Sequence, residues 1–274
     1  MPAVVLAASP GVEQARQLYQ QTEYLPALDL LKKVPSPDVE ALLLTGQTYY
    51  GLGNYSQATE VLERAVRLAP NDADVQVWLG RAWGRRAESS AVWNQLRYAG
   101  RAHEAFERAV ALDPQNRTAL ADLFEFYIEA PGIAGGGLDK AAKLVPRMTA
   151  VDAAWGERAQ ARIDEARNDF NSAERHLRSA IELSPGKAGP WADLARFLAR
   201  RGRIEESDAG FGQATRLAPN DPDVWFVRAK TYVEKNRNVA DARQLLERYL
   251  TAPLTPEHPP RAEARLLLER IGRR

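Results

Sequence analysis

The stretch of sequence that decides the fold reads NYSQATEVLERAVRLAP and spans residues 54–70. Two later stretches share its pattern, GRAHEAFERAVALDP at residues 100–114 and SAERHLRSAIELSP at residues 172–185. In all three, a small residue is followed four positions later by a bulky apolar residue, then three positions later by Ala, and five further on by Pro. This spacing puts the apolar residues on one face of a helix, which the proline ends. The chain therefore contains a repeated amphipathic helix.

Another helix precedes the repeated one. Apolar residues recur with helical spacing before each stretch, and Pro219 follows Pro185 after 34 residues. Small residues occupy positions 8 and 20 of the repeat, as Gly46 and Ala58 do in the repeat that begins at Val39. Residues of this size let two helix backbones approach closely. The sequence thus predicts helical hairpins whose two helices cross at these positions.

The pattern resembles the tetratricopeptide repeat family, and the resemblance covers nearly the whole chain. It implies an all-α fold, a right-handed superhelical solenoid of about seven antiparallel helix pairs with a C-terminal capping helix, because stacked repeats bury the faces that one pair leaves exposed. We expect an N-terminal tail at residues 1–10, the solenoid at 11–257 and the capping helix at 258–274. The expected repeats are 11–38, 39–72, 73–116, 117–153, 154–187, 188–221 and 222–257.

Two repeats depart from the 34-residue period. The repeat at 73–116 has ten extra residues around 85–96, where no strong helix breaker occurs, so we expect extended helices joined by a longer turn. The repeat at 117–153 contains the insertion APGIAGGGLDK at residues 130–140, which predicts a flexible loop followed by a helix from about Leu138.

The composition excludes several classes of function. The chain has Lys+Arg 37 against Asp+Glu 36 and a net charge of +1, which argues against a general binder of polyanions. With no cysteine and 3 histidines, it has no disulfide framework and little material for a metal site. No motif pairs a nucleophile with a base, so we expect no enzymatic activity, no metal and no cofactor. No stretch reaches the ~20 apolar residues of a membrane span.

The first nine residues, MPAVVLAAS, leave the compartment open. They resemble the end of a signal peptide but lack its basic start. They are either a shortened leader or an ordinary N-terminus.

The resemblance also implies that the first helix of every repeat lines a concave groove, which receives a peptide or a partner helix. Position 9 of that helix is expected to point into the groove, and its occupants are Arg16, Gln47, Arg81, Glu125, Arg162, Arg196 and Lys230. Nearby groove positions hold Arg85, Arg158 and Arg200, and apolar contacts are expected from Tyr50 and Phe226. The expected groove is partly basic, although the chain as a whole is nearly neutral.

Three interpretations of this basic groove are open. In the first, its cations pair with local acids on a solvated face. In the second, they bind an acidic or carboxylate-ended protein segment through bidentate contacts. In the third, they bind the backbone of a single-stranded nucleic acid. Gln47 and Glu125 interrupt the continuous basic track that a nucleic acid needs. Chaperone-binding members of the family hold a C-terminal carboxylate with Lys and Asn at set groove positions, and no Asn occupies position 9 here. The sequence therefore predicts a non-catalytic scaffold that binds a protein or peptide, with nucleic-acid binding as the alternative.

Three tryptophans fall off the main core positions of the repeat, namely Trp78, Trp93 and Trp155. They either contact a ligand or pack within the irregular repeats.

Overall fold

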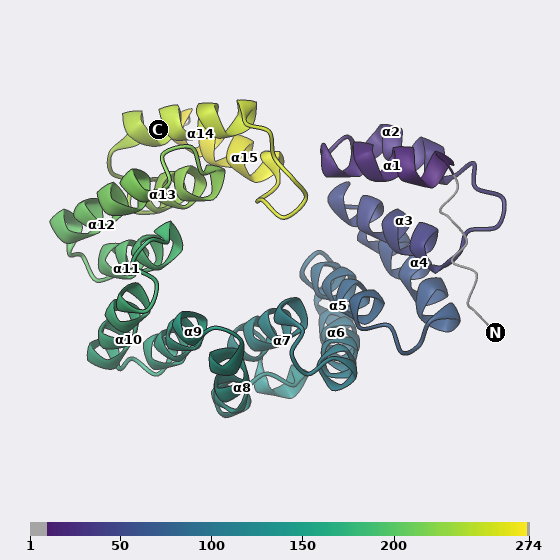
Figure 1. The fold of residues 1–274 in the computed structure, drawn as a ribbon, viewed down its shortest axis with the longest axis horizontal. Coiled ribbons are helices and arrows are strands. Elements are labelled where there is room, and N and C mark those ends of the chain that lie inside the picture. Colours follow the sequence, from purple (N-terminus) through teal and green to yellow (C-terminus); the bar gives the residue numbers. More distant parts are fainter. Residues whose placement is uncertain (1–9, 273–274) are drawn as a thin grey trace. The chain divides into compact units, whose positions relative to one another are not determined.

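The computed structural model describes residues 10–272, and this part of the chain is helical (Figure 1). It contains fifteen α-helices and one 3₁₀ helix among the described residues. The all-α fold predicted from the sequence is therefore confirmed. The tail predicted at residues 1–10 lies outside the described residues as far as residue 9, which includes the stretch that resembles a signal peptide, and Pro10 already begins the first helix. Residues 273–274 also lie outside the described residues. None of the helices described is long and apolar enough to cross a bilayer.

Contacts among the helices divide the chain into two compact halves, with the division between Leu144 and Val145. The N-terminal half contains α1 (Pro10–Gln20), α2 (Tyr24–Leu31), α3 (Val39–Gly51), α4 (Tyr55–Leu68), α5 (Ala73–Glu88), α6 (Val92–Leu112), α7 (Arg117–Glu129), η1 (Gly132–Ala134) and the start of α8 (Leu138–Val151). The C-terminal half contains the rest of α8 with α9 (Ala153–Ala166), α10 (Phe170–Glu182), α11 (Ala188–Arg200), α12 (Ile204–Leu217), α13 (Pro222–Glu234), α14 (Val239–Thr251) and α15 (Arg261–Gly272).

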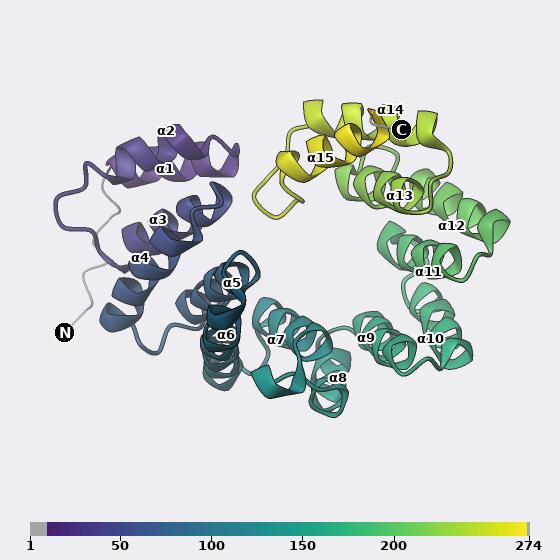
Figure 2. The same cartoon turned by 180° about the vertical axis from the view of Figure 1, so that it is seen from behind.

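Each half is built from hairpins of consecutive helices. The hairpins are α1 with α2, α3 with α4 and α5 with α6 in the N-terminal half, and α9 with α10, α11 with α12 and α13 with α14 in the C-terminal half. Figure 2 shows from behind how helices that follow one another within a half lie side by side. The first helices of successive repeats also contact one another. We call α1, α3, α5 and α7 the N-terminal row, and α9, α11, α13 and α15 the C-terminal row.

The small residues predicted at helix crossings are buried. Ala58 and Ala173, both at position 20, have no exposed surface. A Cβ atom on Gly46 would collide with the side chain of Leu62, and one on Gly80 would lie 2.5 Å from the Phe106 ring. Each hairpin packs closely here because these residues leave room for the bulky side chain of the neighbouring helix.

Acidic residues fix the starts of several helices. The side chain of Asp72 accepts hydrogen bonds from the backbone N–H groups of Asp74 and Val75 at 2.9 and 3.1 Å. Asp221 accepts one from the N–H group of Asp223 at 2.8 Å. These carboxylates satisfy donors that a helix start leaves unpaired, so α5 and α13 each begin at a defined residue after the proline turn.

The repeat at 73–116 differs from the sequence-based expectation in its turn. Its helices are long, with 16 residues in α5 and 21 in α6. Residues 89–91 alone connect them, a link no longer than residues 52–54 between α3 and α4. The extra residues therefore lengthen the helices and not the turn, and residues 85–96 contain no glycine or proline. The first turn of α6 carries Val92 and Trp93, which are 77% and 83% exposed.

The glycine-rich insertion at 130–140 folds back on α7. Residues Gly132–Ala134 form a 3₁₀ helix, and α8 begins at Leu138, as expected. The N–H group of Gly137 donates to the carbonyl oxygen of Tyr127 at 2.8 Å, and Lys140 Nζ donates to that of Gly135 at 2.8 Å. Gly135 has a φ of 102°, which favours glycine. The glycine-rich sequence did not predict this hydrogen-bonded turn.

Candidate functional site

In the N-terminal row, the predicted groove arginines lie against carboxylates. Arg81 of α5 donates from Nε to Oδ2 of Asp122 on α7 at 2.5 Å, and from Nη2 to Oδ1 at 3.2 Å. Arg85, one turn farther along α5, pairs with Glu88 at 2.5 Å. The Arg81 pair joins two first helices and is the less exposed of the two, with 30% and 19% of the side chains accessible. The charge of both arginines is thus compensated within the protein.

The C-terminal row shows the same pairing between α9 and α11. Arg158 Nε lies 2.5 Å from Asp193 Oδ2. Arg200 donates from Nε and Nη2 to the two carboxylate oxygens of Glu165 at 2.6 and 2.7 Å. Arg196 Nη1 lies 3.8 Å from Asp193. Partly exposed pairs of this kind contribute ~0.2–1 kcal/mol each, so they hold side chains in place more than they stabilise the fold.

At the end of this row, the prediction that Phe226 contacts a ligand in the groove is wrong. Lys230 of α13 pairs with Glu263 of α15 at 2.8 Å and remains accessible. Phe226, on the same helix, is only 2% exposed, and its ring packs on Tyr249 of α14 with centroids 5.0 Å apart. It faces the second helix of its own hairpin, so it is a core residue and not part of an accessible groove. The four other predicted residues of the rows are half-buried on α1, α3, α7 and α9, namely Arg16, Gln47, Glu125 and Arg162.

Three of the predicted residues come together in the N-terminal half with two that the sequence did not group with them. We call Tyr50, Tyr55, Trp78, Arg81 and Arg85 the aromatic–arginine cluster. The ring of Tyr50 contacts those of Tyr55 and Trp78 edge to face, with both centroid distances 5.5 Å. Arg81 lies over Trp78 with Cζ 4.8 Å from the ring centroid, and Arg85 lies over Tyr55 at 5.6 Å.

The cluster is held in place yet remains accessible. Burial raises the pKa of Tyr50 even though Arg85 and Arg81 lower it, so its hydroxyl stays protonated at neutral pH. The Arg85 side chain is 49% exposed, and Trp78 is half-buried. Arg85 Nε donates to Tyr55 Oη at 3.4 Å, which limits the mobility of both side chains. The three helices α3, α4 and α5 thus present ordered aromatic rings and cationic side chains on one surface.

The position of Trp78 outside the main core positions of the repeat indicates a ligand contact there, but no such signal marks its neighbours in the cluster. Trp93 shares that signal and is exposed on α6, outside the cluster. Trp155 is half-buried on α9. Tyr55, the first residue of α4, gives no signal by spacing.

A second set of ion pairs links successive repeats of the C-terminal half. Each joins an arginine at position 16 of one repeat to an acid at position 21 of the repeat before it. Arg203 pairs with Glu174, and Arg237 Nη1 lies 2.5 Å from Asp208 Oδ1. Burial raises the pKa of Asp208, but hydrogen bonds from Arg237 and Tyr232 outweigh it and hold that pKa below its ordinary value.

These pairs predict how stability depends on pH. A carboxyl whose pKa is lower in the folded state stabilises the fold above its unfolded pKa, near ~4, and this contribution is lost as the pH falls through the folded pKa. Asp208→Asn is therefore expected to cost about 1 kcal/mol at pH 7 and to flatten the loss of stability below pH ~4. Urea denaturation at pH 7, 5 and 3 measures both effects.

Glu247→Gln is the control for this prediction, because Glu247 is exposed on α14. Its effect is expected to stay within about 0.5 kcal/mol at pH 7. Identical pH profiles for Asp208→Asn and the wild type would show that this pair does not contribute.

Comparison with known proteins identifies the repeat. Two family models described as tetratricopeptide repeat match residues 39–82 and 164–231. A solved structure of a tetratricopeptide repeat protein from Parabacteroides merdae superposes with a TM-score of 0.62 at 12% identity, and the match covers 96% of this chain and 97% of that one. At that identity, the likeness concerns the fold alone.

Two curated proteins are similar in sequence and much longer. Cellulose synthase operon protein C of Xanthomonas axonopodis pv. citri is 26% identical over 227 residues, which cover 78% of this chain and 14% of that protein. The DnaJ homolog subfamily C member 7 homolog of Schizosaccharomyces pombe is 27% identical over 182 residues, which cover 62% of this chain and 36% of that protein. This chain thus spans well under half the length of either relative.

Proposed function

Because this chain is a tetratricopeptide repeat protein, of a class whose repeats generally mediate protein–protein interaction, we propose that it binds a peptide segment of a partner protein at the aromatic–arginine cluster. The role is non-catalytic, as is typical of this fold. The cluster itself supports the proposal, since Trp, Tyr and Arg are the residues that most often dominate binding energy at protein interfaces.

The order of the cluster favours binding. Contacts between Tyr50 and the rings of Tyr55 and Trp78 fix three large side chains before any ligand arrives. Side chains that are ordered in the free protein lose little entropy on binding, so more of the contact energy appears as affinity. Aromatic rings bury a large area with few rotatable bonds, which suits them to this role.

The ion pairs restrict what the rows can contribute. Arg81, Arg158 and Arg200 already hold carboxylates, so an acidic ligand would have to compete with Asp122, Asp193 and Glu165. Nucleic-acid binding needs a track of uncompensated cations and finds no support in these pairs. We therefore place the partner-binding contacts at the half-exposed rings and not along a basic stripe.

The test is a selection of peptides from a random display library on the full chain, followed by calorimetric titration of the selected peptides. Trp78→Ala is expected to raise Kd about 30-fold, because truncating a central aromatic anchor costs ~2 kcal/mol or more. Thermal melting of the variant checks that it is folded.

Trp93→Ala is the matched control, since Trp93 is 83% exposed and lies outside the cluster. It is expected to change Kd by less than about twofold. Selected peptides that bind Trp78→Ala as tightly as the wild type, or that are lost from Trp93→Ala instead, would contradict the proposal.

A further inference from the structure

Arg237, at position 16 of its repeat, shows how this chain holds a cation just beyond the end of a first helix. Arg237 stacks on the ring of Tyr232, with Cζ 4.5 Å from its centroid. Its Nη2 donates to Ser207 Oγ at 3.0 Å and its Nη1 pairs with Asp208. Ser207 and Asp208 are positions 20 and 21 of the preceding repeat. The arginine is thus held by a ring, a small polar group and a carboxylate.

Arg86, at position 14 of its repeat in the N-terminal half and not at position 16, also has a ring and a hydroxyl group as partners but lacks a carboxylate. Its Cζ lies 4.9 Å from the ring centroid of Trp83, which occupies the same repeat position as Tyr232, and 4.8 Å from that of Tyr98. Its Nη1 donates to Thr59 Oγ1 at 2.8 Å. Thr59 is position 21 of its repeat, where the later repeats have Glu174 and Asp208. Among the described residues, no carboxylate lies within 4.0 Å of the Arg86 guanidinium.

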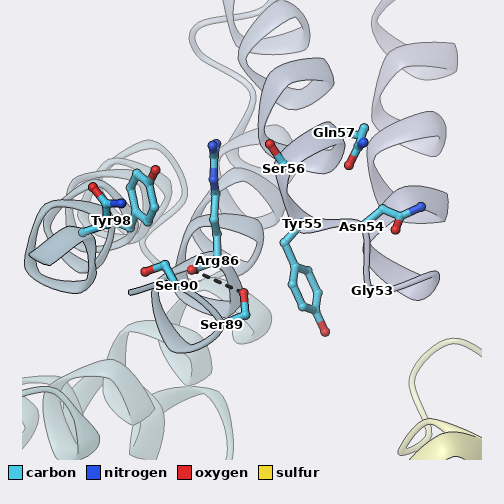
Figure 3. A pocket seen from close by; sticks show the side chains of 10 residues that line it. Gly53, Asn54, Tyr55, Ser56, Gln57, Arg86, Ser89, Ser90 and Tyr98 are labelled. Carbon is cyan, nitrogen blue, oxygen red and sulfur yellow. Dashed lines mark hydrogen bonds between the residues drawn. The ribbon is translucent and has the colours of Figure 1, made fainter. Parts of the chain in front are cut away.

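An open pocket of about 360 Å³ lies beside this arginine. Figure 3 shows Arg86 extending from α5 between Tyr98 of α6 and Ser56 of α4. The wall also carries the hydroxyl group of Ser90, at the link between α5 and α6. The neighbouring Arg101 also lies over Trp83, at 4.8 Å, but it is neutralised by Glu63 at 2.8 Å. Arg86 is therefore an ordered, uncompensated cation in a pocket whose wall carries serine hydroxyl groups.

We propose that this pocket binds a side-chain carboxylate from an acidic segment of a partner protein, an inference that rests on the proposed role in protein binding. The ligand carboxylate takes the place that Asp208 and Glu174 occupy in their own repeats. A carboxylate matches the planar guanidinium with two parallel hydrogen bonds, and the protein itself uses carboxylates at the equivalent positions. Acid recognition is thus assigned to Arg86, away from the paired arginines of the rows.

Thr59→Asp is the sharpest test, because it supplies the missing carboxylate from within. The probe is the acetylated and amidated peptide Gly-Asp-Glu-Asp-Gly, titrated into the full chain while NMR follows the Nε–H signal of Arg86 and the amide of Ser56. The wild type is expected to show saturable shifts, and Thr59→Asp a Kd at least about tenfold higher. Because Thr59 is fully buried, Arg86→Gln, followed through Ser56, provides a second variant with the same expected loss.

Three controls define the outcome. Arg101→Gln is expected to leave the titration unchanged, since Arg101 stacks on the same ring but carries its own acid. The peptide Gly-Asn-Gln-Asn-Gly is expected not to bind. Trp78→Ala is expected to leave this titration unchanged. The proposals for the Arg86 pocket and for the aromatic–arginine cluster are therefore tested independently.

The proposal is overturned if Thr59→Asp and Arg86→Gln bind the acidic peptide like the wild type, or if the amide peptide binds equally well. Inorganic phosphate that saturates the same signals at lower concentration than the acidic peptide would also overturn the assignment of a carboxylate ligand.

Discussion

Phe211→Ala is expected to lower the free energy of unfolding by about 3–5 kcal/mol. Phe211 lies on α12, has no exposed surface and packs edge to face on Tyr232, with centroids 5.9 Å apart and planes at 79°. It belongs to the core that α11, α13 and α14 share. Removing the ring leaves a cavity that helices held by several neighbours cannot close.

Urea denaturation followed by circular dichroism measures this loss. Leu217→Ala, on the same helix, is the control, because Leu217 is 40% exposed and its loss is expected to cost less than about 1 kcal/mol. A similar cost for both substitutions would show that α12 does not pack on α13 as described.

Gly80→Ala and Gly84→Ala are expected to change stability in opposite directions, although both replace a glycine within α5. A Cβ atom on Gly80 would lie 2.5 Å from the Phe106 ring, whereas one on Gly84 meets nothing within 4 Å. Overpacking costs ~1–3 kcal/mol, so Gly80→Ala is expected to be destabilising. Gly84→Ala should gain ~0.5–1 kcal/mol because alanine favours the helix.

The comparison of thermal melting of the two variants tests the crossing of α5 and α6 directly. Helix propensity is the same for both substitutions, so their difference reports the contact with Phe106 alone. If Gly80→Ala were as stable as Gly84→Ala, position 8 would not lie at the crossing, and the assigned repeat register would be wrong.

The hairpins were predictable because the same contact between two helices recurs in several repeats. Gly46 and Gly80 occupy one repeat position, and a bulky side chain of the paired helix, Leu62 or Phe106, fills the space beside each. Spacing along the chain is sufficient to find such contacts, since they recur with the period. The extended α5 and α6 were also predictable, from the absence of a helix breaker, but their short turn was not.

The candidate site was less predictable, because its contacts do not follow the period. Position 9 identified Arg81, but its partner Asp122 lies 41 residues away on another helix. Phe226 is expected from the sequence to make apolar contacts in the groove, whereas its ring packs on Tyr249. The spacing of residues within one helix does not predict whether a large ring at the edge of the core packs inward or faces the groove.

The ion pairs between first helices make the order of the repeats matter. Arg158 and Glu165 on α9 face Asp193 and Arg200 on α11, two bonds of opposite polarity between the same neighbours. Recombination that excised residues 188–221 would strip both partners from α9 at once and set it beside a helix with different charges. Gene duplication can lengthen such an array without loss only where the charges of adjoining repeats match. In this chain, the ion pairs therefore restrict which repeat can follow which.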